Sequence, residues 1–263
     1  MGTPTSRRVR LLGGDVDLVT PADVLRRVHA AAAGGQPTLI ANHNFHSLFL
    51  IRRSPRLRVF FAEADVIQID STPLIWWGQR VGLPLTRDMR STYLDWRDDF
   101  WRVADARRWR VFYLGGAPGV ADTAAARLAE RYPDAQIACQ HGYFDRAPQS
   151  AENQAVLARI AAFDPQVLLV GMGMPLQEIW ALENRAAIKR GAILTVGAAF
   201  DYEAGVQTAA PRWTGRLGVE WLARLASQPR RLAGRYLVEP WSLIGPAIGD
   251  IAAAFARPRG AGH

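Results

Sequence analysis

The sequence predicts an α/β fold in which helices cover both faces of a parallel sheet. The main observation is an alternation of short apolar runs, glycine-containing loops and amphipathic helical segments between residues 110 and 201. In addition, 49% of the 263 residues are hydrophobic, which allows a sizeable core and argues against disorder. We therefore predict a Rossmann-like parallel sheet.

The first third of the chain contains weaker signals of the same kind. Two short strands flank Gly13-Gly14, and a helix begins at Pro21 after Thr20 as N-cap and stops at Gly34. Further apolar strands are predicted at 37–41 and 64–70, and an amphipathic helix at 92–108.

The regular alternation follows. Strands are predicted at 110–114, 136–139, 166–170 and 192–196, and helices at 120–132, 151–163 and 177–189. Ligands of parallel sheets bind outside the carboxyl ends of the strands. The loops that follow the predicted strands are therefore expected to converge on one cleft.

The chain is predicted to have three parts: an N-terminal α/β subdomain at 1–107, a Rossmann-like subdomain at 108–211, and a basic amphipathic tail at 212–263. The tail has no strand signal and predicts two or three short amphipathic helices, with a break at Pro229. It carries eight arginines against three acidic residues, a large part of the net charge of +8. Arginine suits phosphate recognition, and arginines interleaved with tryptophans suit an anionic membrane surface.

Other bulk features limit the function. The N-terminus lacks the long apolar core of a secretory signal, and no uncharged apolar run is long enough to span a membrane. Cys139 is the only cysteine, so an internal disulfide is excluded and a reducing compartment is expected. We interpret Cys139 as a buried strand residue and not as a nucleophile.

Polar side chains follow two of the predicted strands. Asp70 ends one of them and is either a general base or part of the start of the next helix, whose cap is Asp70 or Ser71. After the preceding strand come Asn42, His43, Asn44 and His46. This cluster fits either hydrogen bonding to a hydroxyl-rich ligand or ordinary turn chemistry, and the sequence leaves both open.

Glycine loops form a second group of candidates. Gly115-Gly116 begins a short strand-to-helix turn, a weak signal by itself. The stretch "GMGMPLQE" is more specific, because Gly171, Gly173 and a helix-starting proline precede Gln177. Here we expect backbone amides and Gln177 to hold a ligand. The ordinary role of Glu178 would be a favourable charge at the helix dipole.

A metal site has little support. The five histidines show no zinc-type spacing. Asp15 and Asp17 form a D-x-D, but they lie in a predicted hairpin and not after a long apolar strand. We therefore expect no metal ion and no cofactor.

Several motifs together resemble the WecG/TagA/CpsF glycosyltransferases, glycosyltransferase family 26. They are "GYF", "GMGMPLQE", "VGAAFDYEAG", "APRWTGRLGVEWLARL" and "QPRRLAGRYL", and the resemblance runs from about "TLIANHN" to "GRYL". The segments "NHNFHSL", "IDSTPLIWW" and "STYLDW" are most similar to the branch of the xanthan-type exopolysaccharide glucosyltransferase.

The resemblance implies that the subdomain at 108–211 binds a nucleotide sugar and that the tail at 212–263 associates with the membrane. It also implies roles for individual residues. Asp70 matches the proposed catalytic base of the family. Substrate-binding roles are implied for sheet-end residues, and contact with the acceptor diphosphate or membrane for tail arginines. The first set is Asn42, Asn44, Arg90, Gly115, Gly116, Tyr143, Gly171, Gly173, Gln177 and Asp201; the second is Arg212, Arg224, Arg231 and Arg235.

The chain departs from the family pattern at three positions. Ser71 replaces the glycine after the catalytic aspartate, and Asn42 replaces a threonine. Both changes leave the transferred sugar open. Ala209 replaces an arginine, so one cation of the phosphate clamp is missing.

The resemblance implies a UDP-sugar-dependent hexosyltransferase of the inverting type. The hexose, of the glucose or N-acetylmannosamine type, would pass to a polyprenyl-diphosphate-linked saccharide in surface-polysaccharide biosynthesis. We expect a cytoplasmic protein, peripheral on the inner face of the cell membrane, without nucleic acid as partner; homo-oligomerisation is left open. Two alternatives are a nucleotide-dependent oxidoreductase and a non-catalytic binder of anionic surfaces or nucleic acid.

Overall fold

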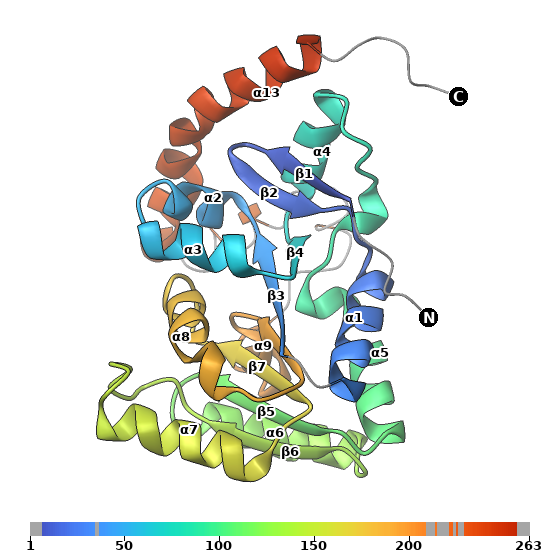
Figure 1. The fold of residues 1–263 in the computed structure, drawn as a ribbon, viewed down its shortest axis with the longest axis vertical. Helices are drawn as coiled ribbons and strands as arrows, with labels where there is room; N and C mark the ends of the chain where they lie inside the picture. The colour runs from blue at the N-terminus through green and yellow to red at the C-terminus, as the bar shows by residue number, and fades with distance from the viewer. Residues whose placement is uncertain are drawn as a thin grey trace.

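A six-stranded parallel sheet forms the centre of the protein in the computed structural model, which describes residues 7–34, 37–208, 214, 221, 222, 225 and 229–256. The strand order is β4-β3-β8-β7-β5-β6 (Figure 1). The strands are β3 (Thr38–His43), β4 (Val66–Ile69), β5 (Arg110–Gly115), β6 (Gln136–Gln140), β7 (Val167–Gly171) and β8 (Ala192–Thr195). The predicted parallel α/β sheet is confirmed.

Strands from the first 107 residues belong to the same sheet as those from residues 108–211. β3 pairs with β4 on one side and with β8 on the other, all in parallel register. The division of the chain into three parts stays a prediction.

Helices cover both faces of the sheet, as predicted. Alternate residues of β7 show why: Leu168 and Val170 enter one core, whereas Val167 and Leu169 enter the other. The first core is completed by α2 (Phe45–Ile51), α3 (Pro55–Glu63), α4 (Thr72–Arg80), α7 (Ala151–Phe163) and α8 (Leu176–Asn184). The second is completed by α1 (Pro21–Ala33), α5 (Tyr93–Ala106), α6 (Val120–Arg131) and α9 (Ala199–Glu203).

Local signals explain where several helices begin. The Thr20 side chain accepts a hydrogen bond from the backbone of Asp23, whose carboxylate bonds back to Thr20, and Pro21 occupies the first turn. Two short helices, α2 and α3, were not predicted, although Asn44 and Ser54 cap them. A further short helix, α9, begins at Ala199 and was also not predicted.

A two-stranded hairpin lies against the sheet. Its strands are β1 (Arg8–Leu11) and β2 (Gly14–Asp17), and the turn places Leu12 and Gly13 at positive φ. The carboxylate of Asp17 binds the Arg8 guanidinium and accepts the Ile67 amide hydrogen at 2.8 Å. This links the hairpin to β4.

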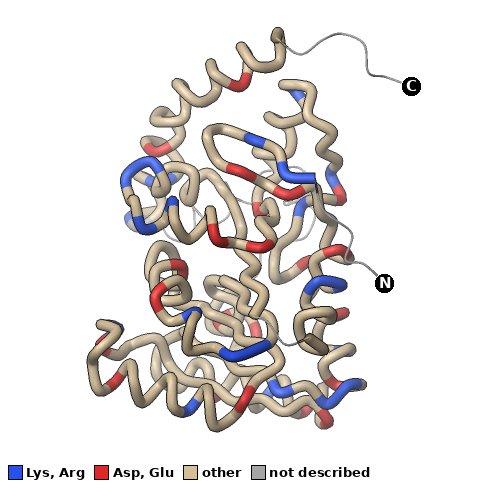
Figure 2. Tube along the Cα trace, viewed as in Figure 1, with Lys and Arg blue, Asp and Glu red and all other residues tan. Residues whose placement is uncertain are grey.

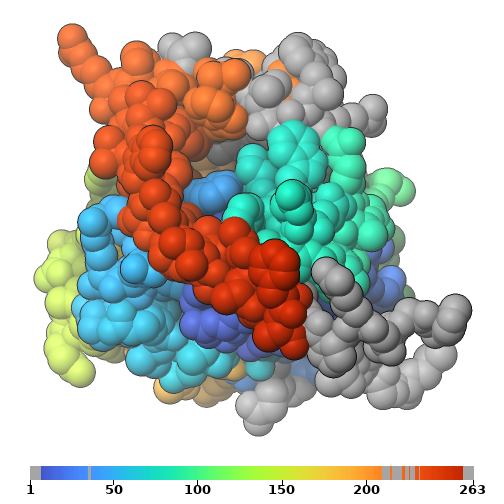
Figure 3. All heavy atoms as spheres, turned by 90° about the horizontal axis from the view of Figure 1, so that it is seen from above, coloured from blue at the N-terminus to red at the C-terminus, as the bar shows by residue number. Residues whose placement is uncertain are grey.

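The described part of the tail is helical, as predicted. It comprises α12 (Pro229–Ala233), a π-helical turn η3 (Gly234–Val238), a 3₁₀ turn η4 (Glu239–Leu243) and α13 (Ile244–Ala256). Two further 3₁₀ turns occur earlier, η1 (Arg87–Met89) and η2 (Arg185–Ala187). α13 lies at the end of the molecule opposite β6 and α7, and crosses the surface between α2–α3 and α4 (Figures 1 and 3).

Two contacts hold α13 in this position. The Asp250 carboxylate accepts hydrogen bonds from the Leu12 amide at 2.9 Å and from the Trp77 indole at 2.8 Å. Leu243, just before α13, is buried in the first core. The described tail is therefore part of the packed structure and not a separate arm.

Candidate functional site

Asp70 and Asn42 lie together at the carboxyl edge of the sheet. The Asn42 amide donates to Oδ2 of Asp70 across 3.5 Å, and the Asn42 carbonyl oxygen accepts from the Thr195 hydroxyl at 3.2 Å. Asn42 is the penultimate residue of β3, Asp70 directly follows β4 and Thr195 ends β8, so the ends of three adjacent strands contribute one side chain each. The Thr195 bond fixes the orientation of the amide, which directs its NH₂ group at the carboxylate.

The backbone places Asp70 before α4 and not in its cap. The Asp70 amide donates to the His43 carbonyl at 2.8 Å, which extends the β3–β4 ladder by one residue. Ser71 occupies the N-cap position, and its side chain makes no capping hydrogen bond. The geometry therefore does not favour a capping role for Asp70. A half-buried carboxylate at a strand end suits a general base.

The histidines and Asn44 behave differently from one another. Asn44 caps α2 by accepting the Ser47 amide hydrogen at 3.0 Å, so its side-chain oxygen has a structural role. His43 is fully buried and stacks on Phe61, and burial lowers the pKa of its imidazole to about 3. His43 is therefore a core residue, a role that neither of the two alternatives left open by the sequence included. Substrate binding by Asn44 stays a prediction.

Arg90 lies beside Asp70 although the two are far apart in the sequence. Arg90 forms a parallel bridge with Ile69, and the neighbouring Ser91 amide donates to the Ile69 carbonyl at 2.8 Å. The guanidinium of Arg90 forms an ion pair with Asp95 at 3.3 Å. The predicted cation is thus at the carboxyl end of β4, held by a carboxylate of α5.

The glycine loops meet at the switch point of the sheet. β5 and β7 are neighbours in the sheet. The connection after β5 leads to β6 on one side of this pair, whereas the connection after β7 leads to β8 on the other side. Ligands of open parallel sheets bind at such a crevice. A side chain at Gly115 would lie 2.3 Å from the Gly171 carbonyl oxygen, and Gly116 and Gly173 have positive φ. Close approach of two backbones therefore requires glycine at 115, and the backbone conformation favours glycine at 116 and 173.

Gln177 connects two of these loops. Its side-chain oxygen accepts hydrogen bonds from the amides of Gly173 at 3.2 Å and Gly197 at 3.0 Å, and its NH₂ group donates to Glu178 at 2.6 Å. The side chain is 1% exposed. Gln177 thus fixes the loops after β7 and β8, and its direct contact with a ligand stays a prediction.

Glu178 was expected to be a favourable charge at the helix dipole, and its surroundings in the structure are different. It is 1% exposed, and no described atom bonds its Oε2. Burial raises the pKa of the Glu178 carboxyl to about 7, although the hydrogen bond from Gln177 acts in the opposite direction. Thr195 and Glu178 were both missed as site residues. A polar residue inside the apolar run "AILTV" was the available signal for Thr195.

Two predicted residues lie elsewhere on the same edge. Tyr143 follows β6 at the rim of the sheet and is 70% exposed. Asp201 lies on α9 near Tyr113: burial raises the pKa of the Tyr113 phenol, and the charge of Asp201 adds to this effect. Their roles in binding stay predictions.

Of the four tail arginines, Arg235 can be placed with its side chain. The tail contacts α2 through His46, whose Nδ1 lies 2.6 Å from Oε2 of Glu239. Burial and the charge of Arg235 lower the pKa of His46, against the effect of Glu239. The charge of Arg235 is therefore felt at His46 on α2, the helix that Asn44 caps. Arg212, Arg224, the side chain of Arg231 and the departure at Ala209 lie outside the described residues.

The D-x-D carboxylates have arginine partners. Asp17 binds Arg8, and Asp15 lies 3.3 Å from Arg10. Over the part of the chain that the structure describes, no group of three or more histidine, cysteine and acidic side chains could hold a metal ion. The same part contains no helix of the length and apolar character needed to cross a bilayer.

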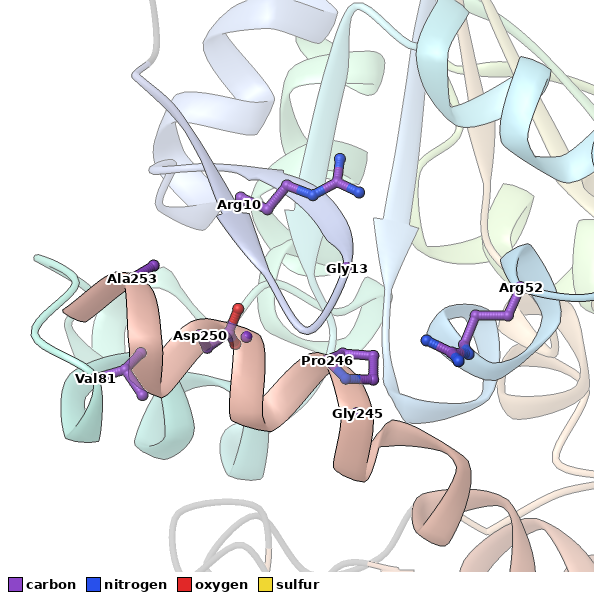
Figure 4. A pocket seen from close by; sticks show the side chains of 9 residues that line it. Arg10, Gly13, Arg52, Val81, Gly245, Pro246, Asp250 and Ala253 are labelled. Atoms are coloured by element: carbon purple, nitrogen blue, oxygen red, sulfur yellow. The ribbon is translucent and has the colours of Figure 1, made fainter. Parts of the chain in front are cut away.

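Two grooves flank α13. One, of about 490 Å³, is called the apolar groove below; its described lining residues are Leu12, Phe45, Pro73, Trp76, Trp77, Arg80, Pro240, Leu243, Ile244 and Ala247. The other, of about 380 Å³, is called the arginine-flanked groove; it lies beside the hairpin tip and is lined by Arg10, Gly13, Arg52, Val81, Gly245, Pro246, Gly249, Asp250 and Ala253 (Figure 4).

Glycine loops at the switch point and a carboxylate at the same edge are typical of α/β proteins that bind their ligands at the strand ends. Comparison with known proteins narrows this class, because the model of the glycosyl transferase WecG/TagA/CpsF family matches residues 9–254. The chain belongs to this family and is a glycosyltransferase.

Two relatives come from Staphylococcus aureus, strains MW2 and NCTC 8325 / PS 47. Each is an N-acetylglucosaminyldiphosphoundecaprenol N-acetyl-beta-D-mannosaminyltransferase. Each is 26% identical to this chain over 235 residues, which cover 86% of this chain and 87% of the relative. The family resemblance is confirmed, and the oxidoreductase and non-catalytic alternatives are set aside.

Proposed function

We propose that the protein transfers a hexosyl residue from a UDP-sugar to a saccharide linked by diphosphate to a polyprenol. The observation that carries the proposal is the Asn42–Asp70–Thr195 cluster at the edge where the glycine loops of β5 and β7 meet. The names of the relatives support the acceptor, because both enzymes act on an undecaprenyl-diphosphate saccharide.

In this proposal Asp70 acts as the general base. It takes the proton of the acceptor hydroxyl while the hydroxyl oxygen forms a bond to the anomeric carbon of the donor. The bond between that carbon and the UDP oxygen breaks, and UDP leaves with the electron pair. Attack opposite an α-linked UDP inverts the configuration, which agrees with the β linkage in the names of the relatives.

The donor binds at the switch point in this proposal. The loops after β5, β7 and β8 supply backbone amides, and Gln177 holds two of the loops in place. Amides and arginines stabilise the charge that develops on the leaving diphosphate. Arg90 and Arg235 are the described candidates, and the reaction then requires no metal ion.

The enzyme reaches its acceptor as a peripheral membrane protein on the cytoplasmic face in this proposal. α13 exposes Ile244, Ile248, Ile251 and Phe255, which recur at helical spacing along one face. Trp241 precedes them and is 71% exposed. Asp250 is the only charged residue of α13 (Figure 2). Such a helix lies in the interface of a bilayer and does not cross it.

Arginines next to α13 complete this surface. Arg52 and Arg53, at the end of α2, are both exposed, and Arg52 lines the arginine-flanked groove beside Gly245 and Gly249. Each arginine close to an anionic bilayer adds about 1 kcal/mol to binding. Apolar side chains and cations at one end of the molecule therefore favour anionic lipid.

The experiment that tests the proposal is a donor screen with a defined acceptor. Purified protein is incubated with UDP-glucose, UDP-N-acetylglucosamine or UDP-N-acetylmannosamine and an N-acetylglucosaminyl diphosphate carrying a prenyl chain, with and without EDTA. We expect one UDP-sugar to yield a β-linked disaccharide product, unchanged by EDTA. No product from any of the three donors would contradict the proposal, and loss with EDTA followed by rescue with manganese would contradict metal independence.

A further inference from the structure

We propose that the apolar groove between α4 and α13 holds the first isoprene units of the acceptor's polyprenyl chain, an inference that rests on the proposed function. Nine of its ten described lining residues are apolar, and Arg80 is the exception. Sites for sugars or nucleotides need several convergent polar groups. A groove with this lining suits a hydrocarbon.

Two residues that line the groove are close in the chain to residues of the candidate site. Phe45 directly follows Asn44, and Pro73 lies in the first turn of α4, three residues after Asp70. Asn44 and Asp70 both follow neighbouring strands at the carboxyl edge of the sheet. A chain that entered the groove beside these two residues would leave its diphosphate near Asp70, where the transfer occurs.

The groove also opens on the exposed apolar face of α13. Ile244 lines the groove and is also the first member of the row that continues through Ile248 and Ile251. Trp76, on the opposite wall, is 42% exposed. Apolar surface therefore continues from the face proposed to touch the bilayer to the residues beside Asp70. This continuity identifies a membrane-borne chain as the occupant.

The walls of the groove are fixed before any ligand arrives. Asp250 bonds both the Trp77 indole of α4 and the Leu12 amide of the hairpin, and so it holds α13 at a set distance from α4. Leu243, 3% exposed, packs into the core beneath. A groove that is formed in advance spends little of its binding free energy on ordering its own side chains.

The test compares two acceptors with the same N-acetylglucosaminyl diphosphate, one carrying several isoprene units and the other a methyl group. Both are assayed in detergent, so that attachment to a bilayer does not contribute. The variant is Ala247→Phe, which fills the groove from α13. The matched control is Ala253→Phe, which adds the same bulk to the same helix beside the arginine-flanked groove.

We expect Ala247→Phe to lower kcat/KM for the prenyl acceptor roughly tenfold or more, since one isoprene unit carries about the apolar surface of a leucine side chain. The methyl acceptor should react as in the wild type, and Ala253→Phe should change neither value. If Ala247→Phe fails to fold, the smaller Ala247→Leu provides the same comparison.

Three results would overturn the role of the groove in binding the prenyl chain and leave the proposed function intact. The wild type could use both acceptors equally well, Ala247→Phe could affect both acceptors equally, or Ala247→Phe could change only the oligomeric state. Failure of the proposed function gives a different result, since the wild type would then transfer sugar to neither acceptor.

Discussion

The amide nitrogen of Asn42 lies 3.5 Å from a carboxylate oxygen of Asp70, although 28 residues separate the two in the chain. The contact exists because β3 and β4 are parallel neighbours and both residues lie at the carboxyl ends of these strands. Thr195, from the strand on the other side of β3, fixes the amide in turn. We infer that Asn42 positions the base.

Replacing Asn42 tests this positioning role. Asn42→Ala removes the amide, and we expect kcat to fall roughly tenfold, the effect of one hydrogen bond to a charged group. The dissociation constant of the donor should stay unchanged. Asn42→Thr retains a hydroxyl that can donate to Asp70, so it should lose less. If donor affinity falls as much as kcat, Asn42 is a binding residue and not a positioning one.

Gln177 allows a second test, because its oxygen bonds two loop amides. Gln177→Leu leaves the amides of Gly173 and Gly197 without this acceptor, and we expect a loss of roughly 2–4 kcal/mol in the free energy of unfolding. Donor affinity should fall as well, since both loops lie at the proposed donor site.

The matched control is Gln166→Leu. Gln166 accepts the Arg110 amide hydrogen at 2.8 Å where β5 begins, at the opposite edge of the sheet. This variant should lose stability and keep the affinity for the UDP-sugar. Equal donor affinity in both variants, measured by calorimetry, would show that Gln177 serves the fold alone.

Glu178 predicts a pH dependence of stability. Its folded pKa of about 7 lies above the ordinary value of 4.5, so the folded protein holds this proton more tightly than the unfolded chain. The resulting stabilisation is complete below about pH 4.5 and is lost as the pH rises through about 7. The full difference corresponds to about 3 kcal/mol.

Urea unfolding at several pH values measures this effect. The side chain of Glu178→Gln cannot ionise. The free energy of unfolding of this variant, relative to that of the wild type, should therefore increase as the pH rises from 5 to 8. The exposed control Glu130→Gln should show the same pH dependence as the wild type. Parallel pH profiles for the wild type and Glu178→Gln would mean that Glu178 is not held protonated in the fold.

The exposed face of α13 predicts how the protein attaches to a membrane. Ile248→Ser together with Phe255→Ser should weaken co-sedimentation with anionic liposomes at least tenfold, because burying each side chain contributes about 1.5–3 kcal/mol. The control is Val206→Ser, which removes a 67% exposed apolar side chain outside the tail. Unchanged co-sedimentation of the double variant would exclude α13 as the attachment site.

Strong local signals made most of the sheet predictable from the sequence. Thr20-Pro21 and Gly34 mark the ends of α1, and glycine loops separate the strands and helices from β5 onward. The helices α2 and α3 escaped prediction because they are short, and their caps Asn44 and Ser54 look like loop residues. Boundaries set by one or two turns depend on tertiary contacts that no local pattern contains.

Several residues of the candidate site could be predicted from the sequence, but the hydrogen bonds between them could not. Strand-end reasoning brought Asp70 and Asn42 to one edge, but the place of Thr195 depends on β8 pairing with β3, a non-local property. Gln177 was expected to face a ligand, whereas in the structure its side-chain oxygen accepts a hydrogen bond from the amide of Gly197, twenty residues further along the chain. The burial of Glu178 likewise follows from the packing of the whole fold.

The central claim is that Asp70 is the base, and the most direct measurement is single-turnover transfer by Asp70→Asn. This change keeps the size and hydrogen bonding of the side chain but removes its ability to accept the proton. We expect the rate to fall roughly 10²–10⁴-fold, with the affinity for the UDP-sugar largely intact. The control is Asp65→Asn, because Asp65 lies just before β4 at its other end and binds the Leu39 amide at 2.7 Å. Turnover of Asp70→Asn close to that of the wild type would contradict the assignment.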